Sequence, residues 1–207
     1  TQDQKSYATS VSLPRIPLGK DNGIHKTFVI LEGAPKSGTP RPGTQSILVD
    51  QKGCHYTPHA MIVPVGSKVE ITNSDPILHN VHGIQGGSGV FNYAQAKQGL
   101  RETVDMTMTK PGIISLSCEA GHPWMSAFLY VTTHKYVALT DDNGEFVIKD
   151  VPPGTYTLKM WHEGVTLKQI NKRLQTYEYE EPYELTQEVT VMPNAEASAN
   201  FDLTLRQ

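Results

Sequence analysis

The chain contains little cysteine, few charged residues and no long apolar run. Of its 207 residues, two are cysteine and 19% are charged, and the formal net charge is −3 at pH 7. Cys54 and Cys118 form neither a CxxC pair nor a disulfide framework, so they either pair with each other or act separately. No apolar run approaches the ~18 residues of a membrane helix. A slightly acidic chain without clustered lysine and arginine is not expected to bind nucleic acid.

Charge is distributed unevenly along the chain. Residues 1–133 hold 11 basic and 9 acidic side chains, whereas residues 134–207 hold 7 basic and 12 acidic ones. Such a change of sign favours two domains over one. Residues 1–24 are polar and contain several proline and glycine residues, which predicts an extended N-terminal arm. Because the sequence begins at Thr1 without a methionine, we expect an exported chain, periplasmic or extracellular, whose leader has been removed.

Short alternating segments bounded by turn signals predict an all-β chain. In Ser67–Thr72 apolar and polar residues alternate, which is typical of a half-buried strand. The same alternation in Ile113–Cys118 makes Cys118 the inward-pointing end of a strand. From about residue 134 the pattern starts again, and Asp141–Gly144 is a hairpin signal. Many short strands separated by turns indicate β-sandwiches.

Four residues form a pattern that is typical of copper binding. Cys118, His122 and Met125 share one short loop, and His79 follows a strand upstream. One thiolate, two imidazoles and a weak axial thioether are the ligand set of blue-copper electron-transfer sites. Such a set accommodates both Cu(I) and Cu(II), and a rigid loop keeps its geometry similar in the two states.

The region around these four residues resembles the cupredoxins, and plastocyanin and its relatives in particular. The resemblance rests on the order Tyr-x-Pro at position 56, the segment Val65–Asn73, His79-Asn80-Val81, and the Cys-His-Met loop. It implies a Greek-key β-sandwich over residues 25–133. It also implies that copper is bound by His79, Cys118 and His122 with Met125 axial, and that Asn80 holds the ligand loop by hydrogen bonds.

The loop spacing C-x3-H-x2-M also resembles half of the binuclear copper loop of cytochrome oxidase subunit II. In that loop another cysteine lies four residues earlier, and here Ile114 occupies that position. The resemblance therefore implies one copper per chain.

Cys54 and His59 leave three interpretations open. Cys54 is a buried packing thiol, or it forms a disulfide with Cys118 and removes the copper thiolate, or Cys54 or His59 joins the metal site. His82, three residues after His79, is another candidate ligand, although a surface histidine is the simpler interpretation. The sequence also resembles a bacterial group labelled methylamine-utilisation or carboxypeptidase regulatory-like proteins.

Residues 134–207 resemble a second kind of module. The segment 140–159 is similar to the carboxypeptidase regulatory-like (transthyretin-like) module, which implies a smaller, non-catalytic β-sandwich with a structural or docking role. Trp161-His162-Glu163 resembles a site, but packing is the simpler interpretation. The acidic run Glu178–Glu181 is interpreted as a solvated loop.

The sequence therefore predicts a two-domain electron-transfer protein with one copper, and not an enzyme. The alternative is a copper-binding, copper-delivery or structural subunit of a larger redox assembly, with a Cys54–Cys118 disulfide in place of a blue site. The expected partner is a c-type cytochrome or another copper protein. We expect it to dock on an apolar patch around the His122 edge, formed by Leu78, Pro123 and Trp124 with Ile77.

Overall fold

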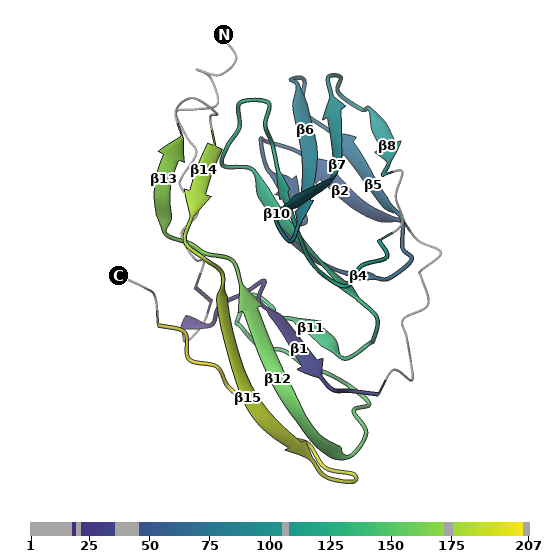
Figure 1. Cartoon of the computed structure of the whole chain (residues 1–207), viewed down its shortest axis with the longest axis vertical. Coiled ribbons are helices and arrows are strands. Elements are labelled where there is room, and N and C mark those ends of the chain that lie inside the picture. The colour runs from purple at the N-terminus through teal and green to yellow at the C-terminus, as the bar shows by residue number, and fades with distance from the viewer. Residues whose placement is uncertain (1–17, 20–21, 36–45, 105–107, 172–175, 205–207) are drawn as a thin grey trace. The chain divides into compact units, whose positions relative to one another are not determined.

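The computed structural model describes residues 18–19, 22–35, 46–104, 108–171 and 176–204, and within these the chain forms fifteen strands and no α-helix (Figure 1). The predicted all-β class is confirmed. Among the described residues, no helix is long and apolar enough to cross a bilayer. The strands are β1 (Phe28–Glu32), β2 (Ile47–Gln51), β3 (Tyr56–Thr57), β4 (Ala60–Pro64), β5 (Val69–Asn73), β6 (His79–Gln85), β7 (Ser88–Gln95), β8 (Arg101–Thr103), β9 (Gly112–Ser117), β10 (Ser126–Thr132), β11 (Val137–Leu139), β12 (Gly154–His162), β13 (Leu167–Asn171), β14 (Thr176–Tyr179) and β15 (Tyr183–Val191).

The chain divides into two compact units. The first holds the described residues between 46 and 133, together with those between 169 and 178. The second holds the described residues between 18 and 35, 134 and 168, and 179 and 204. Most of the predicted N-terminal arm, residues 1–17 and 20–21, lies outside the described residues.

The first unit is a sandwich of two sheets around one apolar core. One sheet has the order β4-β10-β9-β6-β7 and the other β3-β2-β5-β8. Alternate residues of both sheets point into the same buried cluster, as period-2 alternation requires. This cluster includes Val49, Val63, Ile71, Val81, Ile114, Leu116, Leu129 and Val131, and it extends to Cys54, Cys118 and Met125 at one end.

The second unit is built on an antiparallel sheet with the order β11-β1-β12-β15. Its buried cluster is Val29, Leu31, Tyr136, Tyr156 and Leu158, and Phe146, Ile148 and Phe201 pack against it. The predicted turn at Asp141–Gly144 is present: the Gly144 amide donates to the Asp141 carbonyl at 3.0 Å, and Gly144 has a φ of 80°, which glycine adopts without strain.

The structure differs from the sequence prediction in the place of the first apolar run. We expected Thr27–Leu31 to belong to the first domain, within residues 25–133. Instead β1 is one of the two inner strands of the second unit's sheet, where Phe28 pairs with Leu139 on β11 and with Trp161 on β12. Alternation identifies a strand but not its partner, because pairing with β12 joins residues more than a hundred positions apart.

Candidate metal centre

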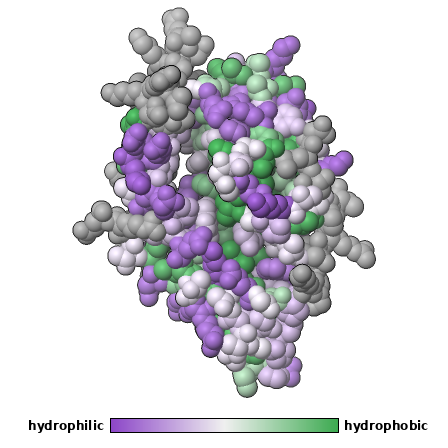
Figure 2. Space-filling view, viewed as in Figure 1, coloured by the Kyte–Doolittle hydropathy of each residue, from purple (hydrophilic) through white to green (hydrophobic). Residues whose placement is uncertain are grey.

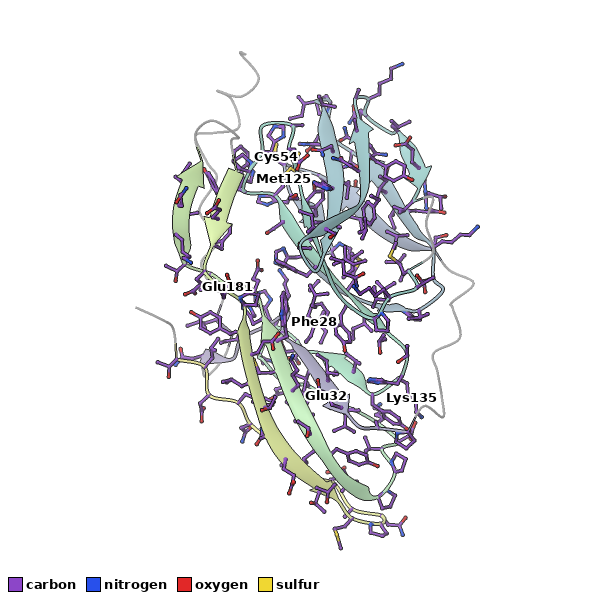
Figure 3. The ribbon with its side chains drawn as sticks, viewed as in Figure 1. Phe28, Glu32, Cys54, Met125, Lys135 and Glu181 are labelled. Carbon is purple, nitrogen blue, oxygen red and sulfur yellow. The ribbon has the colours of Figure 1, made fainter. Side chains whose placement is uncertain are left out.

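Three strand ends bring the predicted ligands to one end of the first sandwich. β6 begins at His79 and β9 ends at Ser117, immediately before Cys118. These strands are antiparallel, with His82 opposite Ser117, so the start of β6 and the end of β9 lie at the same end of the sheet. The loop 118–125 then returns the chain into β10. Figure 3 labels Cys54 and Met125, which both lie at this end.

A tight turn shapes the ligand loop. The Met125 amide donates to the His122 carbonyl at 3.0 Å, with Pro123 at the second position of the turn, where its fixed φ is favourable. Gly121 precedes this turn with a φ of 91°, a conformation that other residues rarely adopt. The sequence Gly-His-Pro-Trp-Met thus folds locally into a loop that directs His122 inward.

His79, Cys118 and His122 form a buried triangle of metal-binding atoms. The two Nδ1 atoms of His79 and His122 are 3.2 Å apart, and the Cys118 Sγ lies 3.9 Å from the first and 3.6 Å from the second. The centre of such a triangle is about 2.1 Å from each atom, and metal bonds to imidazole nitrogen and thiolate sulfur measure about 2.0–2.3 Å. One transition-metal ion therefore fits these three donors without rearrangement.

The surroundings of Cys118 and His122 disfavour the charged form of each side chain. Burial raises the pKa of the Cys118 thiol above its ordinary value, although the amides of Asn80, Ala120 and His122 and the Tyr56 hydroxyl partly oppose this. Burial and the neighbouring His79 lower the pKa of His122. A neutral imidazole offers a lone pair to a metal, and the thiol proton leaves when a metal binds.

Met125 is fully buried in the core cluster that extends to Cys118. Its place in the turn after His122 puts the thioether at the ligand end of the core. The axial role of Met125 stays a prediction.

Asn80 ties the ligand strand to the ligand loop. Its Oδ1 accepts a hydrogen bond from the Glu119 amide at 2.5 Å, and its Nδ2 donates to Asn92 Oδ1 at 2.8 Å. The Tyr56 hydroxyl donates to the Asn80 carbonyl at 2.5 Å. The role of Asn80 around a bound metal stays a prediction.

Cys54 lies beside the triangle, and the structure has both cysteines as free, buried thiols. Together with Asp75 and His79, Cys54 makes a second buried group whose ligand atoms lie within 4.8 Å of one another. Burial, Asp75 and Cys118 raise the pKa of Cys54 to about 11. Of the three interpretations of Cys54, the disulfide is absent from this structure.

The other two candidate histidines are placed elsewhere. His59 is half-buried, with its Nδ1 2.9 Å from the Ser126 carbonyl oxygen and its ring edge-on to Phe128. His82 Nδ1 lies 2.7 Å from a carboxylate oxygen of Glu119. The groups of three ligand-type side chains found among the described residues include neither histidine.

The residues predicted to form a docking patch are exposed to different degrees. Leu78 is 47% exposed, whereas Pro123 and Trp124 are half-buried. The Trp124 indole N–H donates to the Cys54 carbonyl at 3.2 Å, and its ring packs edge-on against His122. Only 5% of His122 is exposed, so its ring reaches the surface by at most an edge. On the face seen in Figure 2, exposed apolar surface is divided into small patches among hydrophilic side chains.

Sequence reasoning missed one residue at the site, Asp75. It lies four positions before His79, and its Oδ2 is 2.9 Å from His79 Nε2. The signal that points to it is the pattern Asn73-x-Asp75-Pro, in which the Asn73 side chain accepts the Asp75 amide at 2.9 Å and forms a local turn.

The comparisons with known proteins are partial. Residues 108–198 match a family model described as polysaccharide lyase family 4, domain II. No curated protein matches. Similar solved structures include a copper-containing nitrite reductase from Thermus scotoductus SA-01, with 26% identity over 42% of this chain and a TM-score of 0.36; this chain spans 22% of that enzyme.

Two further structures are similar over part of the chain. A purple cupredoxin from Nitrosopumilus maritimus has 23% identity, covers 42% of this chain and 100% of its own, and has a TM-score of 0.36. A reduced mutant of amicyanin has 22% identity, covers 50% of this chain and 98% of its own, and has a TM-score of 0.37.

Proposed function

We propose that the first unit is a cupredoxin-like domain that binds one copper ion and transfers single electrons. The observation that carries this proposal is the buried triangle of His79 Nδ1, His122 Nδ1 and Cys118 Sγ, whose centre lies about 2.1 Å from each atom, close to the length of a bond to one metal ion. Two imidazoles and one thiolate in a plane are typical of blue-copper sites, and Met125 is the proposed weak axial ligand. Ile114, buried in β9 where a bridging cysteine would stand, supports one copper and not two.

Bound copper supplies a one-electron couple between Cu(II) and Cu(I). The protein supplies a site that is rigid and dry. Cys118 and Met125 are each about 2% exposed or less, and His79 is not exposed at all. Because the ligand loop is fixed by its own turn and by Asn80, the donors keep their places when the charge changes, which limits reorganisation.

The proposal extends to the setting of the reaction. A carrier of this kind exchanges electrons with a second redox protein, and we propose a c-type cytochrome or another copper protein met outside the cytoplasm. Leu78, exposed beside His79, is the proposed centre of the contact. Weak electron-transfer complexes bury little area, so one exposed leucine with half-buried neighbours is sufficient.

The decisive experiment is a copper titration of the reduced protein, followed by visible absorption and electron paramagnetic resonance. We expect saturation near one copper per chain, an intense thiolate-to-copper band and a mononuclear signal. A mixed-valence binuclear signal would contradict the mononuclear site. A colourless protein without titratable thiols would favour the alternative, a copper-delivery or structural subunit with the cysteines paired.

A further inference from the structure

His79 has two ring nitrogens, and the structure gives each a different neighbour. Nδ1 faces His122 and Cys118, at 3.2 and 3.9 Å. Nε2 lies 2.9 Å from Asp75 Oδ2. Since an ionised carboxylate can only accept hydrogen bonds, Asp75 selects the tautomer of the His79 ring that has the proton on Nε2 and the lone pair on Nδ1.

Two backbone amides donate hydrogen bonds to Asp75. Its Oδ1 accepts the Gly53 amide at 2.8 Å, and its Oδ2 accepts the Cys54 amide at 2.8 Å. Gly53 and Cys54 both have left-handed backbone conformations, with φ of 62° and 57°, so their successive amides converge on one anion. This explains why a non-glycine residue at position 54 adopts a positive φ next to the site.

The carboxylate is buried but compensated. Asp75 is 6% exposed, and a buried charge is costly unless hydrogen bonds or an opposite charge stabilise it. The Gly53 amide supplies a hydrogen bond to Oδ1, and the Cys54 amide and the His79 ring supply hydrogen bonds to Oδ2, so both carboxylate oxygens are compensated. Asp75 is therefore a compensated carboxylate, and its Oδ2 is also available to accept a hydrogen bond from His79 Nε2.

We propose that Asp75 is a positioning residue that fixes the tautomer and orientation of His79 and increases the electron donation of Nδ1 to the metal. This inference rests on the proposed function. A carboxylate behind a metal-bound histidine makes the imidazole more basic, and loss of such a partner typically lowers metal affinity about 10- to 100-fold. A more basic imidazole stabilises Cu(II) more than Cu(I), so Asp75 lowers the reduction potential.

A second metal between Cys54, Asp75 and His79 is the competing use of the same atoms. It would have to replace the Nε2 proton, and it would compete with two amide donors that already point at the carboxylate. The arrangement of donors favours a proton over a cation between Asp75 and His79.

The test compares Asp75→Asn with Asp50→Asn in the full chain. Asp50 is a half-buried neighbour on β2 that accepts from the Ser74 hydroxyl at 3.0 Å and is outside both ligand groups. We expect Asp75→Asn to raise the midpoint potential and to weaken Cu(II) binding about 10- to 100-fold, with a smaller loss for Cu(I). The control should keep wild-type values. Unchanged potential and affinity in a folded Asp75→Asn protein would overturn the proposal.

Two further measurements keep the inference separate from the proposed function. Nitrogen-15 NMR of His79 in the metal-free wild-type protein should show the proton on Nε2, and a proton on Nδ1 would overturn the proposal even if Asp75→Asn does not fold. This result does not depend on copper, whereas a wild-type protein that binds no copper refutes the proposed function alone. A second tightly bound copper that is lost in both Asp75→Asn and Cys54→Ser would make Asp75 a ligand and also overturn the proposal.

Discussion

The ligand end of the first unit and the sheet of the second unit bury different kinds of side chain. In the first unit, Asn73, Asp75, His79 and His122 are buried within one network of hydrogen bonds. In the second, the core cluster consists of aliphatic and tyrosine side chains, and the buried polar side chains among the described residues, Thr27, Thr140 and His162, belong to neither group of candidate ligands. Among the described residues, both groups of three ligand-type side chains lie in the first unit.

The difference indicates that the first unit contains the candidate ligand site, whereas the core cluster of the second unit serves packing. Burying polar groups contributes little to stability, and each unsatisfied one costs free energy. A region that buries an anion, two imidazoles and a thiol within hydrogen-bonding distance of each other is therefore more readily explained by ligand binding than by folding alone. The apolar cluster of the second unit needs only packing to explain it.

The substitution with the largest expected effect removes the proposed copper thiolate, which lies in the first unit. Cys118→Ser should abolish the thiolate-to-copper band, because the thiolate is the charge-transfer donor, and it should greatly weaken copper binding. Cys54→Ser is the matched control, since Cys54 is equally buried but lies outside the triangle. It should leave the band nearly intact. A band that appears or strengthens strongly in Cys54→Ser would mean that the thiols are paired in the native protein.

Core truncations in each unit should separate the two responses to copper. Leu129→Ala in the first unit and Leu158→Ala in the second should each cost about 2–5 kcal/mol, because both leucines are buried and each leaves a cavity. Copper at a thousand times its Kd adds about 4 kcal/mol to a unit that binds it when folded. Thermal unfolding followed by calorimetry should therefore show copper rescuing Leu129→Ala but not Leu158→Ala. Equal rescue of both would show that the units unfold together.

The sequence predicts features that depend on neighbouring residues better than features that depend on contacts between distant residues. The ligand types and their order are local, because the loop 118–125 contains Cys118, His122 and Met125 within eight residues, and strand alternation marks which side points inward. The contact between the Cys54 amide and Asp75 joins positions 21 residues apart and depends on two left-handed residues, which alternation does not report. The pairing of β1 with β12 is equally invisible, since any alternating strand fits several partners.

The raised pKa of Cys54 predicts alkaline sensitivity in the metal-free protein. A free cysteine in the unfolded chain ionises near pH 8.5, whereas burial, Asp75 and Cys118 hold the folded value at about 11. The folded state thus keeps its proton where the unfolded state loses it, so stability is fully present below pH ~8.5 and declines as the pH rises toward 11. Denaturant unfolding at pH 7.5, 9 and 10 should show this decline. Cys54→Ser should decline less, and an identical slope in the variant would assign the effect to other groups.

The smallest expected effect is on partner exchange and leaves both units folded. Leu78 is exposed and directly precedes His79, so Leu78→Lys places a charge at the proposed contact without touching a ligand atom. We expect the bimolecular electron-exchange rate with a c-type cytochrome to fall several-fold while the copper spectrum and midpoint potential stay unchanged, because an apolar contact of small area tolerates a buried charge poorly. Val147→Lys is the matched control, since Val147 is an exposed apolar residue of the second unit and the substitution adds the same charge. Stopped-flow rates at several ionic strengths separate two effects of the substitution. The effect of the added net charge on the exchange rate is screened by salt to the same extent in both variants, whereas the local effect at the contact occurs only in Leu78→Lys. If Val147→Lys slows exchange and Leu78→Lys does not, the partner contacts the second unit. The two units would then still differ in the side chains that they bury, but the proposed contact at Leu78 would be wrong.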